Sequence, residues 1–262
     1  MRCRSGRRPR RPSHQCDERS ANVDIPGRGL RRPMLDGIWA KMTWSKGLFV
    51  LWVFILVWTA SLFLAPLTIA PGSFAWTMGG ANTVDHWDVY ERPAFNAFAQ
   101  AVYVIGDAQC HQMWTRSLWI NGNQMPIDAR MTSLYIFGAI GLFWAMMTPP
   151  SSRASMGIAN AFPGRIRRWA TKIGVERYAL LVVLLGILPV AIDGFTQLFA
   201  SVTQYESTNA VRVLTGVTGG LVIGLLLGMM IKSIKAFDLE FKAFRESLRV
   251  PIETRSGSSE KG

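Results

Sequence analysis

Cys110, His111 and Gln112 are adjacent in a polar segment, and their side chains could take part in metal binding or catalysis. A thiol beside an imidazole can ligate a metal, or its thiolate can act as a nucleophile with the imidazole as base. A metal site would need Asp128 as a third ligand and Met131 as a soft fourth. No CxxC or HxxxH spacing accompanies them. The alternative that His111 and Gln112 only hydrogen-bond the loop therefore stays open.

A second group of residues could form a buried ion pair. Asp193 is the one charged residue of a long apolar run, and Gln197 lies one helical turn further on, on the same helix face. A carboxylate at the centre of the hydrocarbon costs about 2.5–3.5 kcal/mol, so we expect Asp193 to face the protein interior with a cationic partner. Arg130 or Arg212 lies at the right depth. The pair could contribute to a site, or it could only lock two helices together.

These polar residues are expected at one depth of the membrane, so we treat them as one candidate site. Arginine side chains there would suit anionic headgroups. The predicted ligand-binding residues are Cys110, His111, Gln112, Arg116, Arg130, Asp193, Gln197, Asn209 and Arg212. The predicted metal ligands are Cys110, His111 and Asp128.

Four apolar runs must position this site. Each is long enough to cross a hydrocarbon core of about 30 Å, and in lipid each must be an α-helix to satisfy its own backbone. The fold class is therefore an all-α integral membrane four-helix bundle, with a membrane domain over residues 47–231. The predicted spans are residues 48–70, 131–148, 178–200 and 213–231.

The distribution of lysine and arginine predicts the orientation. Between and around the spans the counts along the chain are 12, 3, 6, 1 and 7, out of 29 in total. Because cytoplasmic segments carry the excess of positive charge, both termini are expected on the cytoplasmic side of a prokaryotic plasma membrane. The same pattern explains the net charge of +12 without nucleic acid as a partner. The candidate site is then expected under the outer leaflet.

The flanking segments have simpler interpretations. Residues 1–46 are arginine-rich and are predicted to be a disordered cytoplasmic tail, with Met34 and Met42 as alternative starts to Met1. Residues 93–106 are too short to span and are expected to form an interfacial helix in the first outer loop. Residues 232–262 are predicted to begin as a basic amphipathic helix on the inner leaflet, followed by a disordered tail. Its apolar face would consist of Ile234, Phe237, Phe241, Phe244 and Leu248.

Glycines recur at three- and four-residue spacing on the fourth span. Small residues let helix backbones approach closely, so we expect tight helix packing there in preference to a ligand groove. The glycines are Gly216, Gly219, Gly220, Gly224 and Gly228.

The polar segments, in their order, resemble an uncharacterised prokaryotic family of small membrane proteins, catalogued as domain of unknown function 2085. The motifs that carry the resemblance are CHQ at residues 110–112, RS at 116–117, DGFTQ at 193–197 and ESTNAVR at 206–212. The resemblance covers residues 90–230, approximately. Where the family has CxRC, this chain reads Asp-Ala-Arg-Met at residues 128–131, so a disulfide among those positions is impossible here.

The resemblance implies no established activity, and two functions compete. The first is binding of a lipid, a partner subunit or a small ligand at the polar site, by a monomer or a homo-oligomer. The alternative is a membrane enzyme or a metal- or redox-cofactor protein that uses Cys110, His111 and Asp128. Transport has less support because no internal repeat is visible. No cofactor is identified, and the sequence contains neither GxxxxGK[ST] nor GxGxxG for a nucleotide.

Overall fold

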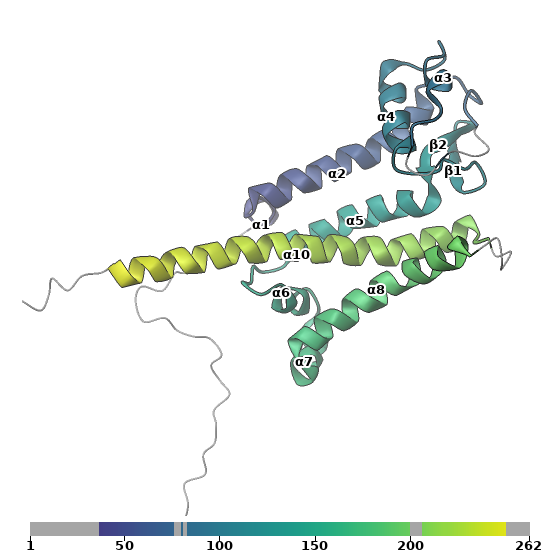
Figure 1. The fold of residues 1–262 in the computed structure, drawn as a ribbon. Helices are drawn as coiled ribbons and strands as arrows, with labels where there is room; N and C mark the ends of the chain where they lie inside the picture. Colours follow the sequence, from purple (N-terminus) through teal and green to yellow (C-terminus); the bar gives the residue numbers. More distant parts are fainter. Residues whose placement is uncertain (1–36, 76–79, 81–82, 200–205, 250–262) are drawn as a thin grey trace, which may run out of the picture. The chain divides into compact units, whose positions relative to one another are not determined.

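A computed structural model describes residues 37–75, 80, 83–199 and 206–249 (Figure 1). The disordered tails predicted for residues 1–36 and after residue 250 lie outside these described residues. The last part of the predicted N-terminal tail is not irregular, because residues Ile38–Thr43 form a short helix, α1.

Four helices are long and apolar enough to cross a membrane, which confirms the all-α, four-span prediction. The ends of the first three helices differ from the predicted spans by a few residues, whereas the fourth helix extends well beyond residue 231. The second span begins at Ala129, because the Asp128 side chain caps its first turn by accepting a hydrogen bond from the N–H of Met131 at 2.6 Å. The four helices are α2 (Lys46–Leu64, continued by the 3₁₀ turn η1, Ala65–Leu67), α5 (Ala129–Met147), α8 (Val175–Leu198) and α10 (Asn209–Arg249).

The amphipathic helix predicted after residue 231 is not a separate element of the structure. Its residues are helical, but they continue the fourth span without a break, so that α10 has 41 residues. At 1.5 Å per residue α10 is about 60 Å long, roughly twice the hydrocarbon thickness. The phenylalanines Phe237, Phe241 and Phe244 on its distal part are exposed. Nothing in residues 232–249 interrupts a helix, since neither proline nor glycine occurs there.

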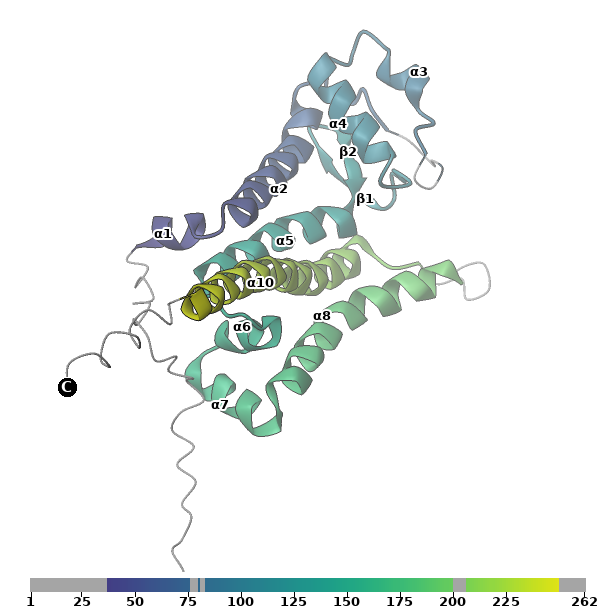
Figure 2. The same ribbon diagram turned by 60° about the vertical axis from the view of Figure 1, so that its left-hand side comes forward.

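α10 lies between α5 and α8, and α2 packs on α5 (Figures 1 and 2). The predicted glycine packing is confirmed on α10. A Cβ added at Gly224 would lie 2.2 Å from the carbonyl oxygen of Gly138, and one at Gly220 would lie 2.7 Å from that of Leu134. The backbones of α5 and α10 are therefore in direct contact.

Lys232 is almost fully buried and closes the far end of α5. Its ammonium donates hydrogen bonds to the carbonyls of Ala145 and Met146 at 3.1 Å, and to that of Thr148. The last carbonyls of a helix lack partners within the helix, and the negative end of its dipole favours a cation. The same ammonium lies 5.6 Å from the centre of the Trp44 ring. Lys232 therefore joins α10 to α5 and to the α1–α2 connection.

The loop between α2 and α5 contains a β-hairpin that was not predicted. Strands β1 (Ser117–Ile120) and β2 (Asn123–Asp128) pair antiparallel, and residues 121–122 make the turn. Asn121 and Gly122 both have positive φ, at 54° and 69°. That combination defines a type I′ turn, for which Asn-Gly is the preferred sequence.

The helix predicted in this loop is present as α4, Ala97–Asp107, and it packs against β2 and η1. A Cβ at Gly106 would lie 2.4 Å from the carbonyl oxygen of Pro126, so only glycine allows this approach. Val102 is buried, whereas Phe98 and Ile105 are exposed. We call the described residues of 65–128, which include η1, α3 (Trp87–Tyr90), α4, β1 and β2, the hairpin region.

The segment between α5 and α8 also contains two helices that the sequence did not predict. They are α6, Ala154–Asn160, and α7, Gly164–Ile173. α6 packs against both α8 and α10, and Ile158 and Ala159 are buried there. This end of α8 is thereby attached to α10 by a third element.

Candidate functional site

The charged residue predicted inside the third span has a partner at the start of the second. Arg130, in the first turn of α5, donates from Nη2 to Oδ2 of Asp193 at 2.5 Å and to the amide oxygen of Gln197 at 3.0 Å. Asp193 and Gln197 therefore share a face of α8, as their spacing predicted. Of the two arginines expected to serve Asp193, Arg130 is the one that pairs with it.

Arg212 forms a second centre one turn into α10. Its Nη1 donates to the side-chain oxygen of Asn209 at 3.2 Å, and its Nη2 lies 3.6 Å from the carboxylate of Glu206. Arg116, from the hairpin region, donates to the same Glu206 oxygen at 3.2 Å. Asn209 also donates to the backbone oxygen of Ser117 at 3.4 Å. The start of α10 is thus tied to the hairpin.

The two centres lie close together. The guanidinium of Arg212 is within electrostatic range of those of Arg116 and Arg130 and of the carboxylate of Asp128. In addition, Thr215 on α10 donates to Asp193 at 3.4 Å. We call this set the ion-pair cluster; its members are Arg116, Arg130, Asp193, Gln197, Glu206, Asn209 and Arg212.

Three buried polar atoms of the cluster have no hydrogen-bond partner among the described residues. They are Nε of Arg130, Oδ1 of Asp193 and Nη2 of Arg212. Buried donors are costly to leave unsatisfied, and arginine donors in particular are often matched to carboxylate or phosphate oxygens. Arg212 is the most buried of the three arginines, at 1% exposure. Nε of Arg130 and Nη2 of Arg212 therefore keep donor capacity for a further anion, whereas Oδ1 of Asp193 is an acceptor.

An apolar, largely open groove of about 530 Å³ is lined in part by Asn209. Its one polar lining residue is Asn209, the same residue that accepts a hydrogen bond from Arg212. The groove follows β1 and the first turns of α10. Its apolar lining consists of Leu118, Ala210, Val213, Leu214 and Val217.

Cys110, His111 and Asp128 are only partly brought together. The carboxylate of Asp128 lies beside the Cys110 thiol, whereas the His111 side chain is exposed. In the part of the chain that the structure describes, three potential metal ligands come within 4.8 Å of one another at a different place, formed by Asp85, His86 and Asp107. The metal site predicted at Cys110 stays a prediction.

The Cys110 thiol is not activated as a nucleophile. Burial, and then the negative charge of Asp128, raises the pKa of Cys110 to about 11. Because only the thiolate reacts, the reactive fraction at neutral pH is about a hundredfold smaller than at the ordinary pKa of 9. The geometry thus gives no support to an enzyme that uses Cys110 as its nucleophile.

Alkylation of Cys110 by a maleimide should therefore be slow in the folded protein at pH 7 and should accelerate as the pH rises toward 11. A Cys3→Ser/Cys16→Ser background leaves Cys110 as the only thiol. Mass spectrometry would follow the reaction, and the same protein unfolded in detergent is the control. Equal rates in the folded and unfolded protein would contradict the buried, high-pKa thiol.

Gln112 belongs to the hairpin region and not to the ion-pair cluster. Its buried side chain donates to the backbone oxygens of Tyr103 at 3.0 Å and Pro126 at 2.9 Å, and it accepts from the hydroxyl of Tyr90 at 2.9 Å. Burial, and then the charge of Asp107, raises the pKa of Tyr90, so the phenol keeps the proton that it donates. These three partners of the Gln112 side chain lie within the loop itself, which is the loop-ordering role left open for Gln112.

The group formed by Asp85, His86 and Asp107 was missed from the sequence. Asp85 and His86 are adjacent, but Asp107 follows 21 residues later at the end of α4. These residues are too far apart in the sequence to form a short local motif. The available signal was a histidine between carboxylates in a loop that must fold back on itself.

Four apolar membrane-crossing helices with a polar cluster at the start of α5 and α10 define a multi-pass membrane protein. Residues 110–226 match the model of a family described as predicted membrane protein (DUF2085). This confirms the resemblance drawn from the polar motifs. The match contains the ion-pair cluster and leaves out residues 85–107.

The comparison with curated proteins gives the same picture. An uncharacterized protein of Methanothermobacter thermautotrophicus is 26% identical over 117 residues, which are 45% of this chain and 82% of the archaeal protein. No solved structure matches the chain.

Proposed function

We propose that this membrane protein binds an anionic lipid at the ion-pair cluster, with the phosphate between Arg116 and Arg212 and an acyl chain in the neighbouring groove. The observation that carries the proposal is the buried Arg212, whose Nη2 lacks a hydrogen-bond partner in the described part of the chain. Its hydrogen-bond partner Asn209 also lines the groove. With the orientation that the charge distribution predicts, this position lies at the outer headgroup level.

The position of Glu206 supports a phosphate in preference to a neutral ligand. One carboxylate oxygen of Glu206 lies 3.2 Å from Arg116 and 3.6 Å from Arg212, so an oxyanion already fits between the two guanidiniums. The Glu206 side chain is 55% exposed and is therefore easily displaced. A phosphate would offer more acceptor oxygens to the same two arginines, with charge-assisted hydrogen bonds.

The lipid proposal predicts opposite effects for two substitutions. Arg212→Gln should lower the affinity for phosphatidylglycerol at least about tenfold, since a hydrogen bond to a charged group is worth about 1.5–3 kcal/mol. Glu206→Gln should raise the affinity, because it removes the competing carboxylate. Phosphatidylglycerol is titrated into the detergent-purified wild type and variants, and native mass spectrometry measures the affinity of each. Phosphatidylcholine, which is zwitterionic, is the comparison lipid.

Two further variants separate a lipid from other ligands. Val213→Trp fills the groove without changing charge, so it should release the lipid but not a soluble phosphate. Arg92→Gln, an exposed arginine of the same loop, should change nothing. Equal affinity of the wild type and Arg212→Gln for phosphatidylglycerol would refute the proposal. A lipid-free complex in which a partner subunit or a second copy of the chain covers this surface would also refute it.

A further inference from the structure

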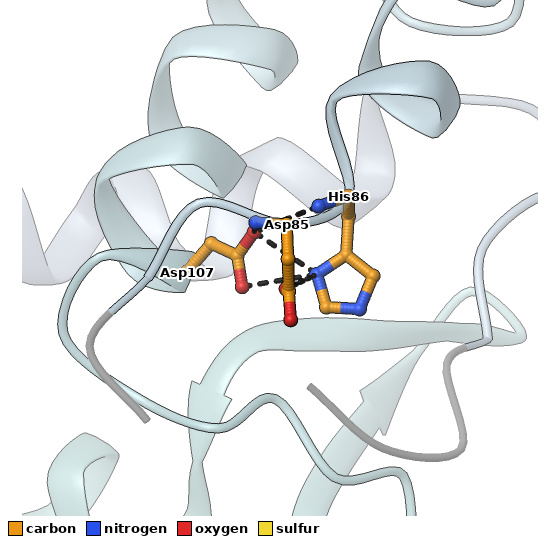
Figure 3. Close-up of side chains that lie close together, drawn as sticks. All are labelled: Asp85, His86 and Asp107. Atoms are coloured by element: carbon orange, nitrogen blue, oxygen red, sulfur yellow. Dashed lines mark hydrogen bonds and ion pairs between the residues drawn. The ribbon is translucent and has the colours of Figure 1, made fainter. Parts of the chain in front are cut away.

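Three ligand-type side chains meet in the hairpin region, away from the ion-pair cluster. Asp85, His86 and Asp107 each place one ligand atom within 4.8 Å of the others, and His86 and Asp107 are fully buried. Figure 3 shows the two carboxylates turned toward the same ring nitrogen of the histidine. Nδ1 of His86 lies 3.0 Å from Oδ1 of Asp85 and 3.0 and 2.9 Å from the two oxygens of Asp107.

This arrangement has more acceptors than one proton can serve. Nδ1 carries at most one hydrogen, whereas three carboxylate oxygens surround it. Ligands bound about 2.1 Å from a shared cation lie about 3.0–3.4 Å from each other in octahedral or tetrahedral geometry. The distances around Nδ1 are therefore close to those of a coordination shell.

Backbone N–H groups orient the two carboxylates. Oδ2 of Asp107 accepts from the N–H groups of Asp85 at 3.3 Å and His86 at 3.4 Å, and Oδ2 of Asp85 accepts from the N–H of Gly80 at 2.6 Å. Oδ1 of each aspartate remains directed at Nδ1. Hydrogen bonds of this kind hold the ligands of a metal ion in place.

The charges favour a divalent cation. Among the described residues, the ion pairs of Asp85 and Asp107 involve no lysine or arginine, and their basic partner is His86. A protonated His86 would leave the group with a net charge of −1, next to a carboxylate that is fully buried. A divalent cation with a neutral imidazole brings the net charge to zero, which removes the cost of an uncompensated buried charge.

We infer that Asp85, His86 and Asp107 form a site for a divalent transition-metal cation of the zinc type. An imidazole with two carboxylates suits zinc or manganese, whereas calcium and magnesium prefer oxygen ligands alone. The Asp85 side chain is 42% exposed, so the cation can enter from that side and a water can complete its coordination. The site is independent of the lipid proposal and shares no residue with Cys110, His111 and Asp128.

Zinc titration of the detergent-purified full-length protein, stripped with a chelator, tests the site by calorimetry. One zinc per chain is expected for the wild type. Asp85→Asn should weaken binding at least about tenfold, and His86→Gln should weaken it more than about a hundredfold. Asp85→Asn is the decisive variant, because its half-exposed side chain can change without disturbing the core. Circular dichroism establishes that each variant is folded.

Matched controls identify the ligands. His111→Gln and Asp88→Asn, which change an exposed histidine and an exposed aspartate nearby, should bind zinc like the wild type. Cobalt in place of zinc should give no thiolate-to-metal charge-transfer band, whereas ligation by Cys110 would produce one. A folded wild type that takes up no zinc, wild-type affinity in Asp85→Asn, or zinc uptake abolished by Cys110→Ser would each overturn the inference.

Discussion

Replacing Asp193 with alanine should lower the free energy of unfolding by about 3–5 kcal/mol, because it leaves the guanidinium of Arg130 buried without its carboxylate. The two side chains are only 5% and 15% exposed and lie 2.5 Å apart, so water cannot replace the lost partner. Gln197 would remain as a neutral acceptor for Arg130 at 3.0 Å and would recover a small part of this energy. Reversible unfolding in mixed detergent micelles, followed by circular dichroism, measures the difference.

Two comparisons distinguish a buried pair from an ordinary one. Asp238→Ala removes an exposed carboxylate that pairs with Lys242 at 2.7 Å on the same helix, and it should cost at most about 0.5 kcal/mol. The double variant Arg130→Met/Asp193→Leu should recover most of the stability lost in Asp193→Ala, since no unpaired charge remains. If Asp193→Ala costs no more than Asp238→Ala, the pair is not shielded from water.

The membrane helices and the buried ion pair were predictable because each follows from one strong physical constraint. In lipid the backbone must satisfy its own hydrogen bonds, which favours helices. A carboxylate in lipid needs a cationic partner, so an arginine was expected beside Asp193. The choice of Arg130 over Arg212 could not be predicted. It depends on how far α5 and α10 are rotated about their axes, and periodicity in the sequence does not set that rotation.

The length of α10 shows that a charged residue at the end of an apolar run need not mark the end of the helix. The predicted fourth span was the uncharged run of residues 213–231, which ends before Lys232. In the structure the helix continues through Lys232, and carbonyls at the end of α5 accept hydrogen bonds from its ammonium. That partner comes from a residue more than 80 positions earlier, which no local pattern could reveal.

The hairpin region contains one feature that could have been predicted and one that could not. Asn121 and Gly122 are a strong local signal for a type I′ hairpin. The meeting of His86 with Asp107 depends instead on how residues 85–86 fold against the end of α4. A turn type can be predicted from adjacent residues, whereas a cluster formed by tertiary folding cannot.

Gly224→Ala should destabilise the protein by about 1–3 kcal/mol or more, because the added methyl group meets backbone and not a movable side chain. Its Cβ would lie 2.2 Å from the carbonyl oxygen of Gly138 and 2.9 Å from the nitrogen of Leu142. α10 can accommodate it only by moving away from α5. Gly47→Ala is the matched control: nothing lies within 4 Å of its Cβ, and the higher helix propensity of alanine should leave stability equal or slightly raised.

A double variant tests whether the close approach of α5 and α10 is the cause. Gly141 faces Gly224 across the same contact, since its Cβ would lie 3.1 Å from the Cα of Gly224 and 2.3 Å from the carbonyl oxygen of Leu221. Once one methyl group has separated the helices, the second fits at little further cost. Gly141→Ala/Gly224→Ala should therefore cost less than the sum of the two single variants. Additive costs would mean that each methyl group is absorbed locally, and that the two helices do not depend on backbone contact for their stability.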